Sequence, residues 1–192
     1  MKELEETPGV WSVSESTALT QQGKVLRNIS RAENVDSRME RRVMAHIRSW
    51  QVARMLRRDF NLLATHIFFR MLKAAPEEKK AIEQLIGEIL AQAAVLKFAV
   101  KNIPGVVIDE TFEVETIPVR LFSRDISFLY RAITSLDDSF ARLESAFRRG
   151  VVSEKDFREM ARPGRQAWSD LRVLIFGKTW QVATESGMNA LK

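Results

Sequence analysis

The chain of 192 residues contains no cysteine, which excludes disulfide bonds, thiolate metal sites and thiol nucleophiles together. It also lacks any apolar run that approaches the roughly 18 residues needed to span a bilayer as a helix. Residues 1–6 do not show the basic and then apolar order of a secretory signal peptide. We therefore expect a cytoplasmic protein with no membrane partner.

Side chains suited to catalysis are also scarce. The two histidines, His46 and His66, have no acidic partner at ligand spacing, so neither predicts a metal site. No nucleophile elbow, Walker loop or dinucleotide-binding glycine pattern occurs. Adjacent residues on a helix point about 100° apart, so Asp137 and Asp138 are better explained as a helix first turn than as a catalytic pair. The sequence predicts no enzyme, no cofactor, no metal and no small-molecule substrate.

What the chain has in excess is positive charge. Its net charge is +5, and 20 of its 30 basic residues are arginine, whose planar fork matches phosphate and guanine. Between residues 24 and 58 there are ten basic residues and three acidic ones, a local excess of +7. This block favours an anionic partner, although arginines also commonly form a solvated helix face or ion pairs. A tryptophan exposed on such a basic surface could stack on an unpaired base.

The first residues differ in composition from the rest. Residues 1–23 carry four glutamates against one lysine, and residues 7–23 are rich in Pro, Gly, Ser and Thr. We expect a mobile N-terminal arm over 1–23 and a single, mainly α-helical domain over 24–192. That domain includes a β-ribbon and helix segment at 106–149.

Capping signals divide the domain into four or five helices. Pro76 is typical of a helix first turn, Ser123 and Ser153 of helix caps, and Gly150 of a helix stop. The expected helices span about 36–73, 76–102, 123–149, 153–162 and 165–177.

The first expected helix contains a discontinuity. Met39, Val43 and Ile47 form one apolar stripe, but beyond about residue 51 apolar residues such as Phe60 lie on the opposite side. Either the helix breaks near 51–53, or it stays straight and buries opposite faces against different partners. The second alternative would make dimerisation part of the fold.

The clearest strand signal is the run 116–122. Ile117, Val119 and Leu121 alternate there with residues of the other face, which is the period of a strand with one buried side. A lone strand is not stable, so we expect it to pair with 106–108 or with a copy in a second chain. A two-stranded ribbon that runs into a helix is one way in which proteins read DNA.

The segment after this strand has two interpretations. Its apolar residues keep to one continuous stripe, and this periodicity favours a single helix over 123–149. Against this, Ser135-Leu136-Asp137-Asp138 fits an S-x-x-D capping signal, so a new helix could begin there. In that case the order becomes strand, helix, turn, helix, as in the ribbon-helix-helix fold.

Several features after Met39 point to one family. They are the run Ile117-Pro118-Val119-Arg120-Leu121, the helix after it, the Arg148-Arg149-Gly150 stop, the short helix at 153–162 and the helix that contains Trp168. Together they resemble the AcaB-type regulators of conjugative plasmids and integrative elements. The resemblance implies a dimeric transcriptional activator of conjugation genes that binds double-stranded DNA. It also implies an atypical ribbon-helix-helix fold attached to a helical domain.

The same resemblance implies which residues meet DNA. The outward face of the ribbon would read bases, which places Thr116 and Arg120 in the major groove. Arg124 and the backbone around Ser135 would lie near phosphates. A different segment, 10–13, could supply the reading ribbon instead.

The alternation in the strand makes its own prediction about Arg120. A register that buries the aliphatic side chains points Arg120 outward, unless it pairs across the ribbon with Glu113 or Glu115. In the basic block, Arg41 and Arg42 are expected on a phosphate-facing surface.

Two functions remain open at this stage. The first is a homodimeric, DNA-binding transcriptional regulator. The alternative is a structural or adaptor protein of the conjugation machinery, which would bind other proteins through its helical faces while its arginines are merely solvated.

Overall fold

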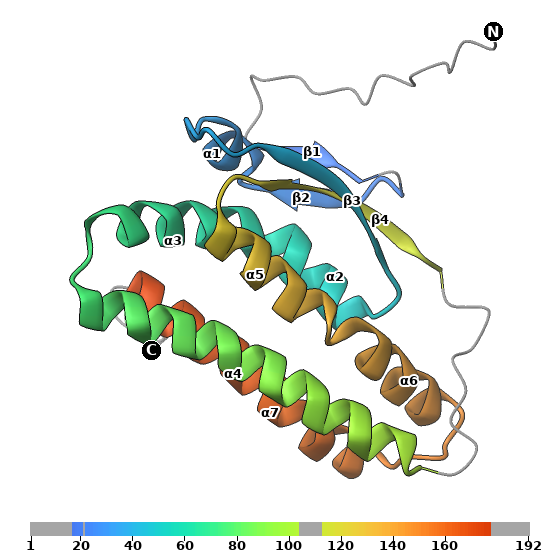
Figure 1. Ribbon diagram of the computed structural model, residues 1–192. Coiled ribbons are helices and arrows are strands. Elements are labelled where there is room, and N and C mark those ends of the chain that lie inside the picture. Colours follow the sequence, from blue (N-terminus) through green and yellow to red (C-terminus); the bar gives the residue numbers. More distant parts are fainter. Residues whose placement is uncertain (1–16, 21, 104–112, 178–192) are drawn as a thin grey trace, which may run out of the picture.

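The computed structural model describes residues 17–20, 22–103 and 113–177, and helices make up most of this part (Figure 1). The fold is mainly α with a short β-ribbon, as the sequence predicted. The strands are β1 (Thr17–Leu19), β2 (Val25–Arg27), β3 (Arg41–Ile47) and β4 (Glu115–Leu121). The helices are α1 (Ile29–Glu33), α2 (Trp50–Met55), α3 (Asn61–Lys73), α4 (Pro76–Lys101), α5 (Arg124–Thr134), α6 (Asp137–Arg148) and α7 (Glu154–Phe176), and the π-helical turn η1 (Leu56–Phe60) joins α2 to α3.

The strand predicted at 116–122 is confirmed as β4, but its partner differs from the expectation. β4 pairs antiparallel with β3, from Arg41 opposite Leu121 to Ile47 opposite Glu115. The expected partner at 106–108 lies outside the described residues. Because both strands come from one chain, this ribbon differs from that of a ribbon-helix-helix dimer, in which two chains pair their strands.

The prediction of a helix over 36–73 was wrong for its first part, because residues 41–47 form β3. Val43, Ala45 and Ile47 face the core, and the residues between them are exposed, which is the period of a strand. An apolar residue at every fourth position also suits a helix. Pairing with the β-branched residues of β4 decides in favour of the strand.

The helix itself begins at Trp50. The Ser49 hydroxyl accepts hydrogen bonds from the two backbone N–H groups that follow Trp50, which is a typical N-cap. The apolar stripe therefore changes sides because a strand gives way to a helix, and the alternative of one straight helix was wrong. Met55, Phe60 and Ile67 are buried within the chain.

Two helices follow β4, so the single helix over 123–149 that periodicity favoured was wrong. α5 ends at Thr134 and α6 begins at Asp137, close to the S-x-x-D signal. β4, α5 and α6 thus have the order strand, helix, turn, helix. Asp137 stands in the first turn of α6, as predicted.

α7 replaces the two helices predicted at 153–162 and 165–177. It continues through Pro163, which is exposed. Gly164 lies where α7 meets the start of α6, and a Cβ atom there would approach Leu136 Cδ2 to 3.2 Å and Phe140 Cζ to 3.3 Å. The glycine permits this close approach between the helices.

Of the arm predicted over 1–23, the structure describes only the last residues, 17–20, 22 and 23. Thr17 to Leu19 form β1, which pairs antiparallel with β2 through a turn at Gly23, where φ is +69°. Only glycine adopts such a φ without strain. The rest of the predicted arm, 1–16, lies outside the described residues.

The elements form layers (Figure 1). The strands and α1 lie above α2, α3 and α5, and α4 and α7 run side by side beneath them. α4 has the predicted bounds within one residue. Apolar side chains of the layers meet in one core. Within the described residues, no helix is both long and apolar enough to cross a bilayer.

Candidate nucleic-acid interface

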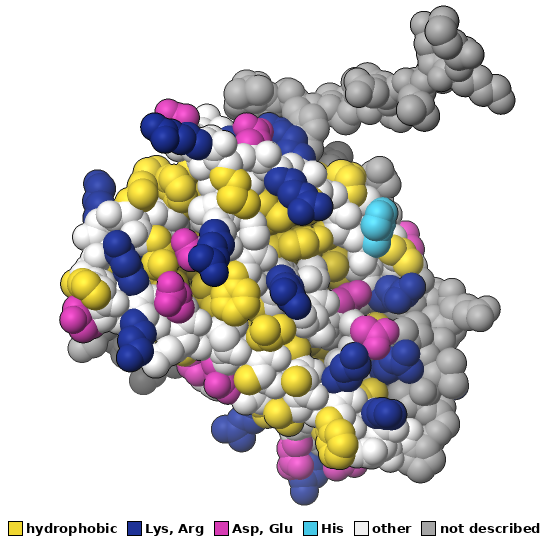
Figure 2. Space-filling view, viewed as in Figure 1, with side chains coloured by type: hydrophobic (Ala, Val, Ile, Leu, Met, Phe, Trp, Pro, Cys, Tyr) yellow, Lys and Arg dark blue, Asp and Glu magenta, His cyan; other side chains and the backbone are white. Residues whose placement is uncertain are grey.

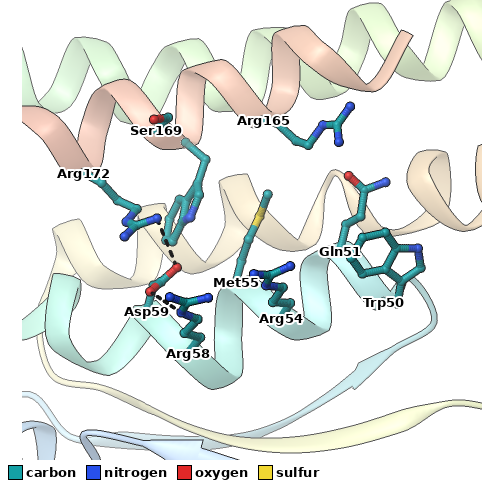
Figure 3. A pocket seen from close by; sticks show the side chains of 10 residues that line it. Trp50, Gln51, Arg54, Met55, Arg58, Asp59, Arg165, Ser169 and Arg172 are labelled. Atoms are coloured by element: carbon teal, nitrogen blue, oxygen red, sulfur yellow. Dashed lines mark ion pairs between the residues drawn. The ribbon is translucent and has the colours of Figure 1, made fainter. Parts of the chain in front are cut away.

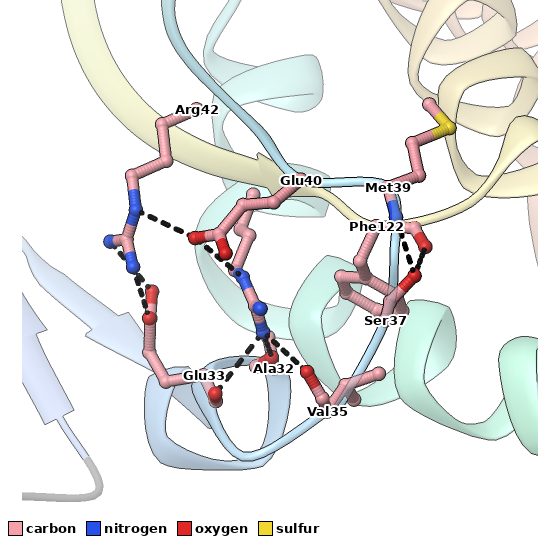
Figure 4. A network of polar contacts seen from close by, with 9 residues as sticks. Ala32, Glu33, Val35, Ser37, Met39, Glu40, Arg42 and Phe122 are labelled. Atoms are coloured by element: carbon pink, nitrogen blue, oxygen red, sulfur yellow. Dashed lines mark hydrogen bonds and ion pairs between the residues drawn. The ribbon is translucent and has the colours of Figure 1, made fainter.

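Arg120, expected in the major groove, is buried in the structure. Its exposed fraction is only 8%, and its guanidinium group lies against the end of α1 and the residues just beyond, where Figure 4 labels Ala32, Glu33 and Val35. Nη1 donates to the carbonyl oxygens of Ala32, Glu33 and Val35, the last two at 3.1 Å. Nε lies 3.3 Å from the Glu40 carboxylate, and its hydrogen bond and charge lower the pKa of Glu40. The prediction that Arg120 points outward was therefore wrong, because a further layer of chain covers this face of β4.

Thr116 and Arg42 are also engaged within the chain. Thr116 is buried, and its hydroxyl lies 3.3 Å from His46 Nδ1. Arg42 is exposed, but its guanidinium group forms two hydrogen bonds with Glu33, at 2.6 and 3.1 Å, and a third with Glu40 at 3.3 Å. Both predicted base-reading side chains, Thr116 and Arg120, are thus inaccessible to a base in this arrangement.

Three other predicted residues do lie on an accessible surface: Arg41, Arg124 and Ser135. Arg124 begins α5, and Arg131 and Ser135 follow about two and three turns later on the same side of the helix. Ser135 Oγ donates to the Arg131 carbonyl oxygen at 2.7 Å. Arg41 extends this surface onto β3, and we call the four residues the α5 basic stripe. Arg131 was not among the residues predicted from the sequence, although it follows Arg124 by about two helix turns and so shares its side of a helix.

The electrostatics of this surface suit an anion. None of the three arginines in the α5 basic stripe forms an ion pair with another residue of the described ranges. Arg41 lies close enough to α5 for its charge to act on Tyr130, whose pKa is raised by burial and lowered in part by that arginine. Figure 2 shows basic side chains spread among apolar, uncharged and some acidic ones over the face formed by β3, α5 and α4. Guanidinium groups without partners can bind phosphates at no cost in broken ion pairs.

Two buried carboxylates fix the junction between β3 and α2. Asp137 accepts hydrogen bonds from the Ser49 N–H at 2.8 Å and the Arg48 N–H at 3.1 Å. Glu144 accepts from the Ser49 hydroxyl at 2.7 Å and the Trp50 N–H at 3.2 Å. Burial raises the pKa of both carboxyl groups, and these hydrogen bonds oppose the rise. The carboxylates satisfy N–H groups at the start of α2, and so hold β3 in place relative to α6.

The histidines show no sign of a metal centre. Throughout the described ranges, no group of three or more His, Cys, Asp or Glu side chains could hold a metal ion. His66 packs edge-on against Phe176, with ring centroids 5.3 Å apart. Burial lowers the pKa of His66, and the charges of Arg31 and Arg70 lower it further.

The comparisons with known proteins bear on the fold. No family model and no curated protein matches the sequence. A solved structure with a similar fold is the crystal structure of selenomethionine-containing AcaB from uropathogenic E. coli. The superposition has a TM-score of 0.55 at 16% sequence identity, and covers 72% of this chain and 77% of the other. The likeness agrees with the family resemblance of the sequence as far as the fold is concerned.

Proposed function

We propose that this protein is a homodimeric, sequence-specific DNA-binding regulator that activates conjugative transfer genes. The α5 basic stripe carries the proposal, because it presents arginines without ion pairs among the described residues on the helix that directly follows the ribbon. The similarity of the fold to AcaB and the resemblance of the sequence to AcaB-type activators support the regulatory role.

The dimensions of the stripe suit a DNA groove. Arg124 and Arg131 are separated by about 10 Å along the axis of α5, and the major groove is roughly 12 Å wide. The two guanidinium groups can therefore contact phosphates on opposite sides of the groove. Such contacts fix the position of the helix, while side chains between them would read the bases.

Binding to a pool of random DNA duplexes, followed by selection of the bound fraction, tests sequence preference. A matched pair of variants then tests the surface. The double variant Arg124→Ala/Arg131→Ala should weaken binding and reduce the slope of log affinity against log salt by about two, roughly 0.9 for each lost phosphate contact. The control Arg158→Ala/Arg162→Ala removes the same charge from exposed positions of α7 and should leave the slope unchanged.

Two results would contradict the proposal in different ways. Equal slopes for both double variants would remove the α5 basic stripe from the DNA interface. Absence of binding by the unaltered protein at low salt, where electrostatic contacts are strongest, would favour the adaptor function instead.

A further inference from the structure

A groove lies between α7 on one side and α2 with η1 on the other, and no residue of α5 lines it. Its volume of about 450 Å³ falls within the roughly 300–1,000 Å³ of small-molecule sites. Figure 3 shows side chains of both walls directed toward the space between the helices. Four arginines come together here: Arg54, Arg58, Arg165 and Arg172.

The groove holds more positive charge than its own carboxylate neutralises. Asp59 is the acidic residue of the lining, and it lies 3.5 Å from Arg172 and 3.9 Å from Arg58. Arg54 and Arg165 have no carboxylate partner among the described residues. Arg165 is partly buried, and its pKa is lowered first by burial and then by a neighbouring arginine. An anion bound in the groove would stabilise the charged Arg165 guanidinium group against both burial and the repulsion by that arginine.

The walls also offer a flat aromatic surface and an amide. Trp50 is 47% exposed, although a tryptophan is usually well buried, and it lines the groove. Next to it Gln51 is only 4% exposed, and neither its amide nitrogen nor its amide oxygen has a well-formed hydrogen bond, although the amide stands beside Glu144. In Figure 3 the Gln51 side chain extends from α2 toward α7. Leaving a buried amide without well-formed hydrogen bonds is costly, and a polar ligand would offset the cost.

We propose that this groove binds a nucleotide. The guanidinium groups of Arg54, Arg58 and Arg165 hold its phosphates, because their forks match phosphate oxygens. The base lies against the Trp50 indole, and the Gln51 amide donates to and accepts from its polar edge. A second hollow shares Arg58 with the groove and adds Arg27, and also Arg70, which pairs with Glu78, so a chain of phosphates finds a further cation there. A free nucleotide and a nucleotide within a DNA strand carry this same chemistry.

Calorimetric titration of the full chain, without DNA, tests the site with three probes. ATP should bind saturably, and more tightly than pyrophosphate or adenosine, because it alone engages both the arginines and the indole. Arg165→Ala should weaken ATP binding about tenfold or more. Arg54→Ala, at an exposed position, should do the same without disturbing the core. Arg162→Ala, an equal change of charge on the outside of α7, should leave ATP affinity within about twofold.

Two further titrations identify the source of the nucleotide and separate this site from the α5 basic stripe. If a single-stranded oligonucleotide binds with the same dependence on Arg54 and Arg165 while ATP does not, the natural ligand is a DNA strand. The Arg124→Ala/Arg131→Ala variant should bind ATP normally, so loss of one site does not imply loss of the other. The proposal would be overturned if neither ATP nor the oligonucleotide bound saturably. It would also be overturned if Arg162→Ala weakened ATP binding as much as Arg165→Ala does.

Discussion

Arg120 fastens the N-terminal segment to the ribbon. Its guanidinium group donates to three carbonyl oxygens at the end of α1 and just beyond, and its Cζ atom lies 5.7 Å from the centre of the Phe122 ring. The Ala32 and Glu33 carbonyls belong to the end of α1, where the last C=O groups lack the partners that a longer helix would supply. One side chain of β4 thereby satisfies several backbone groups in a segment far away in the sequence.

This role predicts a loss of stability when the side chain is removed. Arg120→Ala should lower the free energy of unfolding by about 2–4 kcal/mol, because it removes a buried, charged donor from three carbonyl groups. The neighbouring variant Arg42→Ala breaks ion pairs of an exposed side chain, those with Glu33 and Glu40, and should cost about 1 kcal/mol or less. Urea unfolding of the unaltered protein and of both variants measures the two losses of unfolding free energy.

The ratio of specific to random DNA affinity provides the second readout. Arg120→Ala should leave this ratio unchanged under conditions where the variant is folded. A stable Arg120→Ala protein that has lost its sequence preference would restore Arg120 to the reading surface.

The candidate site was predictable from the sequence where local spacing decides exposure. The family resemblance singled out Arg124 and Ser135, and their spacing agrees with the structure, in which both are exposed on one side of α5. For Thr116 and Arg120, the alternation correctly placed the aliphatic side chains of β4 in the core. It could not show that residues 29–35 cover the opposite face, because that depends on contacts between distant parts of the chain.

At the scale of elements, the contact between α6 and α7 explains why a proline and a glycine stand inside one helix. Proline has no backbone N–H, so the carbonyl group four residues before Pro163 loses its donor within the helix. Because Pro163 is exposed, water can replace that donor. Gly164 is buried against Leu136 and Phe140, at distances that leave no room for a methyl group without a shift of these side chains. The sequence alone predicted a break at this pair because the usual effect of Pro-Gly is to end a helix.

A pair of glycine variants tests this contact. Gly164→Ala should be less stable than Gly87→Ala by about 1–3 kcal/mol, the usual cost of overpacking a core. Gly87 lies within α4 with no atom near the position of a new Cβ, so both variants gain the same helix propensity and the difference isolates the packing. Equal midpoints of thermal unfolding would show that Leu136 and Phe140 can shift to accept the new methyl group without cost.

β3 shows where sequence reasoning about elements failed. Apolar residues at 43 and 47 suit a helix as well as a strand, and the arginines between 38 and 48 suit a helix better. The alternation of Val43, Ala45 and Ile47 was the signal for a strand. This alternation is short, and it becomes evidence for a strand only when it is paired with the strand at 115–121.

At the scale of the whole molecule, the proposed dimer needs a surface other than the ribbon, which is complete within one chain. Exposed apolar side chains on α4 offer one. Phe98 is 71% exposed, the most of any large apolar side chain described, and Val95 lies one turn before it at 59%. Burying such side chains against a second copy is the ordinary source of dimer stability.

Light scattering at micromolar concentration should therefore give twice the chain mass of 22.0 kDa. Phe98→Ser should shift the mass toward that of the monomer, whereas Val173→Ser, at an exposed position of α7, should not. A monomer in the unaltered protein would contradict the proposal of a dimer. A dimer unaffected by Phe98→Ser would place its interface elsewhere.

The pairing of β3 with β4 also constrains when this protein can fold during its synthesis. All of α2, η1, α3 and α4 lies between the two strands, so β3 emerges from the ribosome long before its partner. Until β4 is made, the unpaired N–H and C=O groups of β3 can pair with other strands. Pairing two strands that are so far apart in the sequence is also slow. The two arginines of β3, Arg41 and Arg42, give the unpaired strand a positive charge that opposes its association with other strands. The charge on β3 is therefore expected to matter before β4 has been made, as well as in the finished fold.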